Sequence, residues 1–145
     1  MTASDDLLAP VDYLVLQLPA ASAVAADLDA LLRLADDGVI GVLDAEFVVN
    51  DGGNCRILTT ADASALLGVD ASAWDGASAG LLQSDDLEGL ADELDAGSVA
   101  LVLVYENLWI HSVVGPWSEH GVRVVAEGVV HPEELIAALD AGDDA

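Results

Sequence analysis

The chain has 145 residues, of which 54 % are hydrophobic and 21 % are charged, so it is expected to fold around one core and not to be a disordered polar segment. Its 27 acidic residues face only three basic ones, which gives a formal net charge of −24 at pH 7. Because nucleic acids and anionic membranes are bound largely through Lys and Arg, this charge argues against both partners. No long uncharged apolar stretch and no basic leader region are present, which predicts a soluble, cytoplasmic protein.

Two explanations of the acidity stay open. A high-GC or salt-adapted genome would produce it as a solvated surface, and the scattering of the acids along the chain favours this explanation. The alternative is an acidic surface that binds a basic protein, as a mimic of DNA would.

The first part of the chain predicts a strand, a helix and a second strand. Residues 1–10 are polar, and the apolar run over residues 11–18 is typical of a central strand. Apolar residues recur at helical spacing over residues 20–37, and Gly38 is placed to end that helix. Residues 39–50 form the next predicted strand.

Residues 51–96 are predicted to be an insert that interrupts this alternation of strands and helices. Asp51-Gly52-Gly53-Asn54 indicates a hairpin turn, since glycine adopts positive φ at little cost, and residues 55–59 return as a short strand. A short helix is expected over residues 63–67, and another is expected to begin at Ser84.

The last part repeats the order of the first. Residues 98–105 predict a second central strand, and residues 106–120 a helix that Gly115-Pro116 should kink. A strand over residues 122–130 and a helix that opens at Pro132 complete the prediction.

Two such strand–helix–strand units predict an α+β, ferredoxin-like split βαβ sandwich. The two most apolar strands are expected side by side at the centre of the sheet, and the strands that carry Asp44, Glu46 and Arg123 at its edges. The expected organisation is a flexible N-terminus (residues 1–10), one domain (11–140, with the insert 51–96 and a C-terminal helix) and an acidic tail (141–145).

Several short segments resemble an uncharacterised actinobacterial family of small ferredoxin-like proteins, a domain of unknown function. The most specific of them is the glutamate three residues before a tryptophan, Glu106 and Trp109. The following helix departs from that family, because it holds His111, Gly115 and Pro116 where the family carries arginines. The resemblance implies the ferredoxin-like fold and leaves the function open. The segments are Val11–Val15, Gly38–Asp44, Gly80–Leu82, Tyr105–Trp109 and Pro132–Leu135.

Ser78 lies in Gly76-Ala77-Ser78-Ala79-Gly80, which matches the nucleophile elbow of serine hydrolases. That elbow requires a strand before the serine and a helix directly after it. Residues 71–75 do not have the pattern of a strand. We therefore predict that Ser78 is not a nucleophile, and we assign no catalytic residue.

No motif for a metal or cofactor is present. His111, His120 and His131 lack the spacing of a zinc site, and Cys55 is the only cysteine, which also excludes an internal disulfide. Neither a phosphate-binding glycine loop nor a calcium loop occurs. We therefore predict no metal and no cofactor.

The candidate binding residues are Tyr105, Glu106, Trp109, His111 and Trp117. Trp109 and Trp117 share a helix face, which either packs in the core or anchors a partner.

The sequence favours a non-enzymatic module that self-associates, as a homodimer, or binds another protein, because its mean hydropathy of +0.50 is high for one small domain. One alternative is a small enzyme or ligand sensor with a pocket near Tyr105, Glu106, Trp109 and His111. Another is the acidic mimic.

Overall fold

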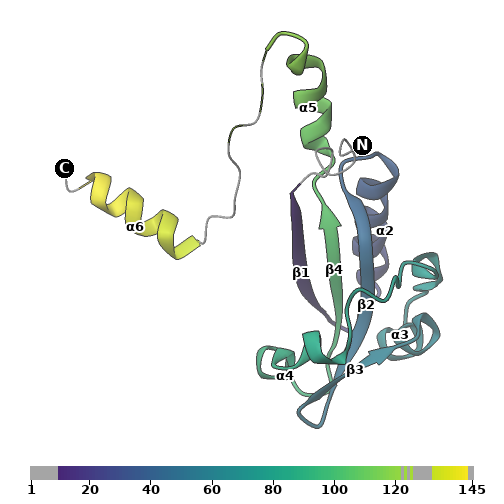
Figure 1. The fold of residues 1–145 in the computed structure, drawn as a ribbon. Helices are drawn as coiled ribbons and strands as arrows, with labels where there is room; N and C mark the ends of the chain where they lie inside the picture. The colour runs from purple at the N-terminus through teal and green to yellow at the C-terminus, as the bar shows by residue number, and fades with distance from the viewer. Residues whose placement is uncertain (1–9, 122, 124, 126–131, 144–145) are drawn as a thin grey trace. The chain divides into compact units, whose positions relative to one another are not determined.

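A computed structural model describes residues 10–121, 123, 125 and 132–143 of the chain (Figure 1). The chain forms two compact units, one that ends at Val113 and one that begins at Val114. The first unit contains the sheet. The second contains the end of helix α5 (Trp109–Ser118) and helix α6 (Pro132–Asp143), which begins at Pro132 as predicted.

The described strands form one open antiparallel sheet in the order β1-β4-β2-β3. They are β1 (Val11–Leu18), β4 (Val99–Glu106), β2 (Gly41–Asp51) and β3 (Asn54–Leu58). Since β4 is antiparallel to both β1 and β2, these two run in the same direction with β4 between them, as in a split βαβ unit. The predicted α+β class and the pairing of the two most apolar strands are confirmed.

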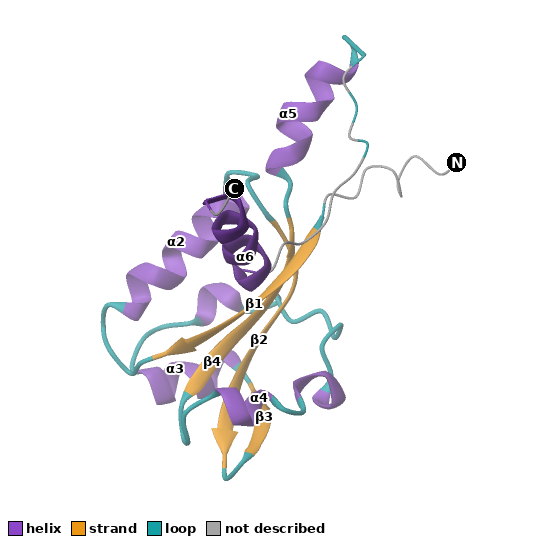
Figure 2. Ribbon diagram, turned by 90° about the vertical axis from the view of Figure 1, so that its left-hand side faces the viewer, coloured by secondary structure: helices purple, strands orange, loops and turns teal. Residues whose placement is uncertain are grey.

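Helices cover the sheet on both faces. Helix α2 (Val24–Asp36) lies along one face (Figure 2), where α3 (Thr60–Leu67) and the short helix η1 (Ser72–Trp74) also contribute to the larger core. On the other face, η2 (Ser84–Leu87) and α4 (Leu90–Glu93) contribute to a smaller core. None of the helices in the described residues is long and apolar enough to cross a membrane.

The prediction that the strand with Asp44 and Glu46 lies at an edge is wrong. Strand β2 pairs with β4 on one side and with β3 on the other, and both carboxylates are buried. The physical reason is that groups from a distant segment of the chain satisfy them, as described below. Strand β1, predicted to be central, lies at the edge of the sheet that the described residues form.

Two predicted helices differ from those observed. The helix expected from Ser84 is divided into η2 and α4, because Gly89 adopts a φ of +89° between them. Helix α5 begins at Trp109, and Pro116 lies within it. The strand expected over residues 122–130 lies mostly outside the described residues; Arg123 and Val125, which are described, belong to no strand or helix.

Candidate functional site

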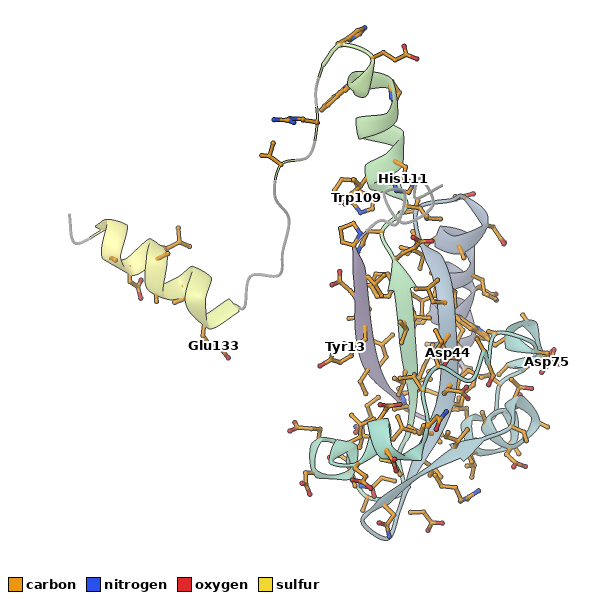
Figure 3. The ribbon with its side chains drawn as sticks, in the orientation of Figure 1. Tyr13, Asp44, Asp75, Trp109, His111 and Glu133 are labelled. Atoms are coloured by element: carbon orange, nitrogen blue, oxygen red, sulfur yellow. The ribbon has the colours of Figure 1, made fainter. Side chains whose placement is uncertain are left out.

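Two carboxylates are buried side by side on β2. Asp44 is 0 % exposed and Glu46 is 5 % exposed. They share one face of the strand because side chains alternate between its two faces (Figure 3 labels Asp44). A buried carboxylate requires hydrogen-bond donors, and none of the three arginines of the chain supplies them in a described ion pair with either residue.

The donors for Asp44 come from the crossing segment, residues 77–82, which lies against β2. The backbone N–H groups of Ala79 and Leu82 each donate to one oxygen of Asp44 at a distance of 2.7 Å. The N–H of Ala45 in turn donates to the carbonyl of Ala77 at 3.2 Å. Asp44 therefore fixes an irregular segment against the sheet.

Glu46 is held by a side chain of the same segment. The hydroxyl of Ser78 donates to the Glu46 carboxyl. Burial raises the pKa of Glu46 above its ordinary value of 4.5; the hydrogen bond from Ser78 opposes this, and the charge and hydrogen bond of Asp44 add to it. Glu46 therefore takes up a proton at a higher pH than an exposed glutamate does.

This pKa shift predicts how the Glu46→Gln variant responds to pH. Above about pH 4.5 an unfolded Glu46 is ionised while the folded one still holds its proton, so wild-type stability falls as pH rises through this window. Glutamine keeps a hydrogen-bonding side chain but does not titrate. Urea unfolding of both proteins between about pH 4 and pH 8 is expected to show the variant gaining stability relative to wild type as pH rises. A difference in stability between the two proteins that does not change with pH would contradict the raised pKa of Glu46.

A cavity of about 370 Å³ opens beside Glu46. It lies where β3 stops pairing with β2, at Leu58 opposite Phe47. Trp74 packs its ring edge-on against Phe47 at a centroid distance of 6.4 Å. The indole N–H of Trp74 is itself buried without a hydrogen-bond partner among the described residues, so it is an unsatisfied donor in a residue that lines the cavity. The polar residues of the cavity are Glu46, Thr59, Thr60, Asp75 and Ser78.

The sequence did not single out this group of residues as a site. The available signal is two acids in the otherwise apolar run from Val42 to Val49, and this pattern also predicts an edge strand. The motif around Ser78 matches only that of a nucleophile. It lies in an irregular segment with no strand before it, as expected, and its hydroxyl is hydrogen-bonded to Glu46.

Four of the predicted binding residues lie at the end of β4 and the start of α5. Tyr105 and Glu106 are half-buried, while Trp109 is 50 % exposed and His111 is exposed (Figure 3). Burial raises the pKa of the Tyr105 hydroxyl, and the charge of Asp12 adds to this effect. The four cavities described for this structure are lined by other residues. Trp117, half-exposed, belongs to the second unit.

The Glu106–Trp109 stretch joins three parts of the fold. The Asn107 side chain donates to the carbonyl of Pro10 at 3.0 Å and to the Asp12 carboxylate at 2.9 Å. The N–H of Trp109 donates to the carbonyl of Val39 at 3.0 Å. A Cβ at Gly41 would come within 3.1 Å of Glu106 Cγ and 3.2 Å of Leu108 Cδ1, so a larger residue there would require these side chains to shift. The stretch thus connects the end of β4 to the start of β1 and to Val39, which precedes β2.

Within the part of the chain that the structure describes, no group of three or more His, Cys, Asp or Glu residues is arranged to hold a metal ion. The candidate site is the cavity beside Glu46, which is lined by the carboxylates of Glu46 and Asp75 and by hydroxyl groups.

Comparison with known proteins gives a family without an assigned activity. No curated protein and no solved structure matches the chain. One family model matches residues 7–141, which is nearly the whole sequence. The chain therefore belongs to DUF6325, a family of unknown function.

Proposed function

We propose that the protein is a non-enzymatic module that self-associates through β1 as a homodimer. The observation that carries this proposal is the exposure of β1 on both faces: Val11 is 48 %, Tyr13 72 % and Leu14 40 % exposed. Among the described residues, no strand pairs with its outer edge. An apolar strand with an unpaired edge is a template for pairing with another strand.

A second copy of the chain is the partner that the charge distribution favours. A protein of net charge −24 repels itself, so a contact between copies is most favourable where acids are few. Asp12 is the only charged residue of β1, and its carboxylate accepts a hydrogen bond from Asn107. Antiparallel pairing of β1 with β1 of a second copy would place identical apolar residues around a two-fold axis.

The ferredoxin-like fold that the sequence predicts belongs to the same proposal. The arrangement with β4 between β1 and β2 supports one split βαβ unit of that fold.

The experiment compares Tyr13→Ser with Leu66→Ser by sedimentation velocity. Leu66 is 50 % exposed on α3 and provides a matched loss of an exposed apolar side chain elsewhere. We expect wild type and Leu66→Ser to be dimers. For Tyr13→Ser we expect a dimer dissociation constant at least about tenfold higher. A monomeric wild type, or equal weakening by both substitutions, would refute the proposal.

Amide hydrogen exchange tests whether the edge of β1 is the interface between copies. If β1 pairs with a second copy, protection of its outward amides should fall as the protein is diluted. Protection of these amides that does not depend on protein concentration would contradict pairing through this edge.

A further inference from the structure

The indole N–H of Trp74 is a buried donor without an acceptor among the described residues. Trp74 is 3 % exposed and is one of the residues that line the cavity beside Glu46. Its ring lies edge-on against Phe47, with an interplanar angle of 85°, so packing fixes the direction in which the N–H points. Because buried N–H groups are almost always paired, an acceptor from outside the described residues is expected here.

The hydroxyl and carboxyl groups at the cavity supply acceptors. The Ser78 hydroxyl donates to the Glu46 carboxyl, and the Thr60 hydroxyl donates to the Asp75 carboxylate. A hydroxyl that has donated its proton keeps its lone pairs, and a carboxylate accepts several hydrogen bonds. A ligand at this cavity must therefore accept from one N–H group and donate to several oxygens.

The charge of the cavity favours an uncharged ligand. The described residues that line it include no Lys, Arg or His, so Glu46 and Asp75 would repel an anion. An ammonium ion or a metal ion has no lone pair with which to accept the N–H of Trp74. A hydroxyl group does both, because its oxygen accepts a hydrogen bond while its proton is donated.

The size of the cavity calls for several hydroxyl groups in one molecule. Its volume of about 370 Å³ is within the range of small-molecule sites and equals the space of about ten water molecules. We propose that the cavity binds an uncharged polyhydroxylated molecule of about the size of a monosaccharide. One hydroxyl oxygen of the ligand accepts from Trp74, and other hydroxyl groups donate to Glu46 and Asp75. None of the described residues that line the cavity belongs to β1, so the proposal is independent of self-association.

The test follows the indole N–H resonances of the ¹⁵N-labelled full chain by NMR. The chain has three tryptophans, and Trp109 and Trp117 are internal controls because both are half-exposed and neither lines the cavity. The probes are D-glucose, D-xylose and myo-inositol, each added to about 50 mM. The control ligand is cyclohexanol, which has a similar ring and a single hydroxyl group. We expect at least one probe to cause a saturable downfield shift of the Trp74 resonance alone, with a Kd of about 10 mM or lower, and cyclohexanol to cause none.

Three results of this titration would overturn the proposal. A Trp74 resonance that no probe shifts would show that water alone, or no group, accepts from the indole N–H. Equal shifts of all three indole resonances would show non-specific contact with the sugar. An equal response to cyclohexanol would show that apolar filling, and not hydroxyl recognition, causes the shift.

Matched variants locate the binding through backbone amide shifts of the cavity residues. Trp74→Phe keeps an aromatic ring but removes the donor, and Asp75→Ala removes an exposed acceptor. Each is expected to weaken binding of the responding probe at least about tenfold. Asp92→Ala removes an exposed acid from α4 and is expected to leave the affinity within about twofold.

Unchanged affinity in Asp75→Ala, or equal weakening by Asp75→Ala and Asp92→Ala, would overturn the proposal. Because Asp75 is exposed, Asp75→Ala decides the question even if Trp74→Phe fails to fold.

Discussion

Replacing Asp44 with alanine is expected to lower the free energy of unfolding by about 2–4 kcal/mol, because two part-buried N–H donors in the crossing segment lose their acceptor and a fully buried unsatisfied donor costs about 1–3 kcal/mol. Those donors are the backbone N–H groups of Ala79 and Leu82. Asp44→Asn is also expected to destabilise, since its amide NH₂ cannot accept the second bond.

Urea unfolding measures this effect. The matched control is Asp36→Ala, which removes an exposed acid at the end of α2 and is expected to change stability by less than about 0.5 kcal/mol. A loss below about 1 kcal/mol for Asp44→Ala would show that the crossing segment does not depend on the carboxylate.

Raising the salt concentration is expected to raise the melting temperature by roughly 5–10 °C between low salt and about 1 M NaCl, which corresponds to a few kcal/mol for a domain of this size. The net charge of −24 is spread along the chain, so neighbouring carboxylates repel one another over distances that low salt does not screen. Calorimetry or thermal circular dichroism gives the measurement. A constant or falling melting temperature would show that local contacts already compensate the acids.

Elements with strong local signals were predictable from the sequence. The apolar run over residues 11–18 has the same bounds as β1, and Gly38 follows α2 with a φ of +74°. Both depend on local chemistry: β-forming side chains in one case and tolerance of positive φ in the other. The break at Gly89 was missed because a single glycine is compatible with a helix as well as with a turn.

Positions within the sheet were harder to predict because they depend on distant partners. Asp44 and Glu46 appeared to mark an exposed strand, since buried acids are rare without partners. Their partners are irregular residues more than 30 positions later, and backbone N–H groups leave no signature in the sequence. A buried interior strand with two acids therefore could not be distinguished from an edge strand.

The candidate binding residues show the same limit. Tyr105, Glu106 and Trp109 were grouped because they are close in sequence, and the structure gives their stretch a joining role. The cavity instead brings together Glu46 and Asp75, from segments far apart in the chain. The ligand-sensor alternative names Tyr105, Glu106, Trp109 and His111, whereas the cavities described for this structure are lined by other residues.

Light scattering of the unmodified protein at about 50 µM, in low salt and in about 1 M NaCl, tests self-association most directly. Apolar contact between two strongly acidic chains should strengthen as repulsion is screened. We predict a mass of twice the 14.8 kDa of the chain in high salt, with a larger dimer fraction there than in low salt. A mass of 14.8 kDa under both conditions would contradict the proposed function.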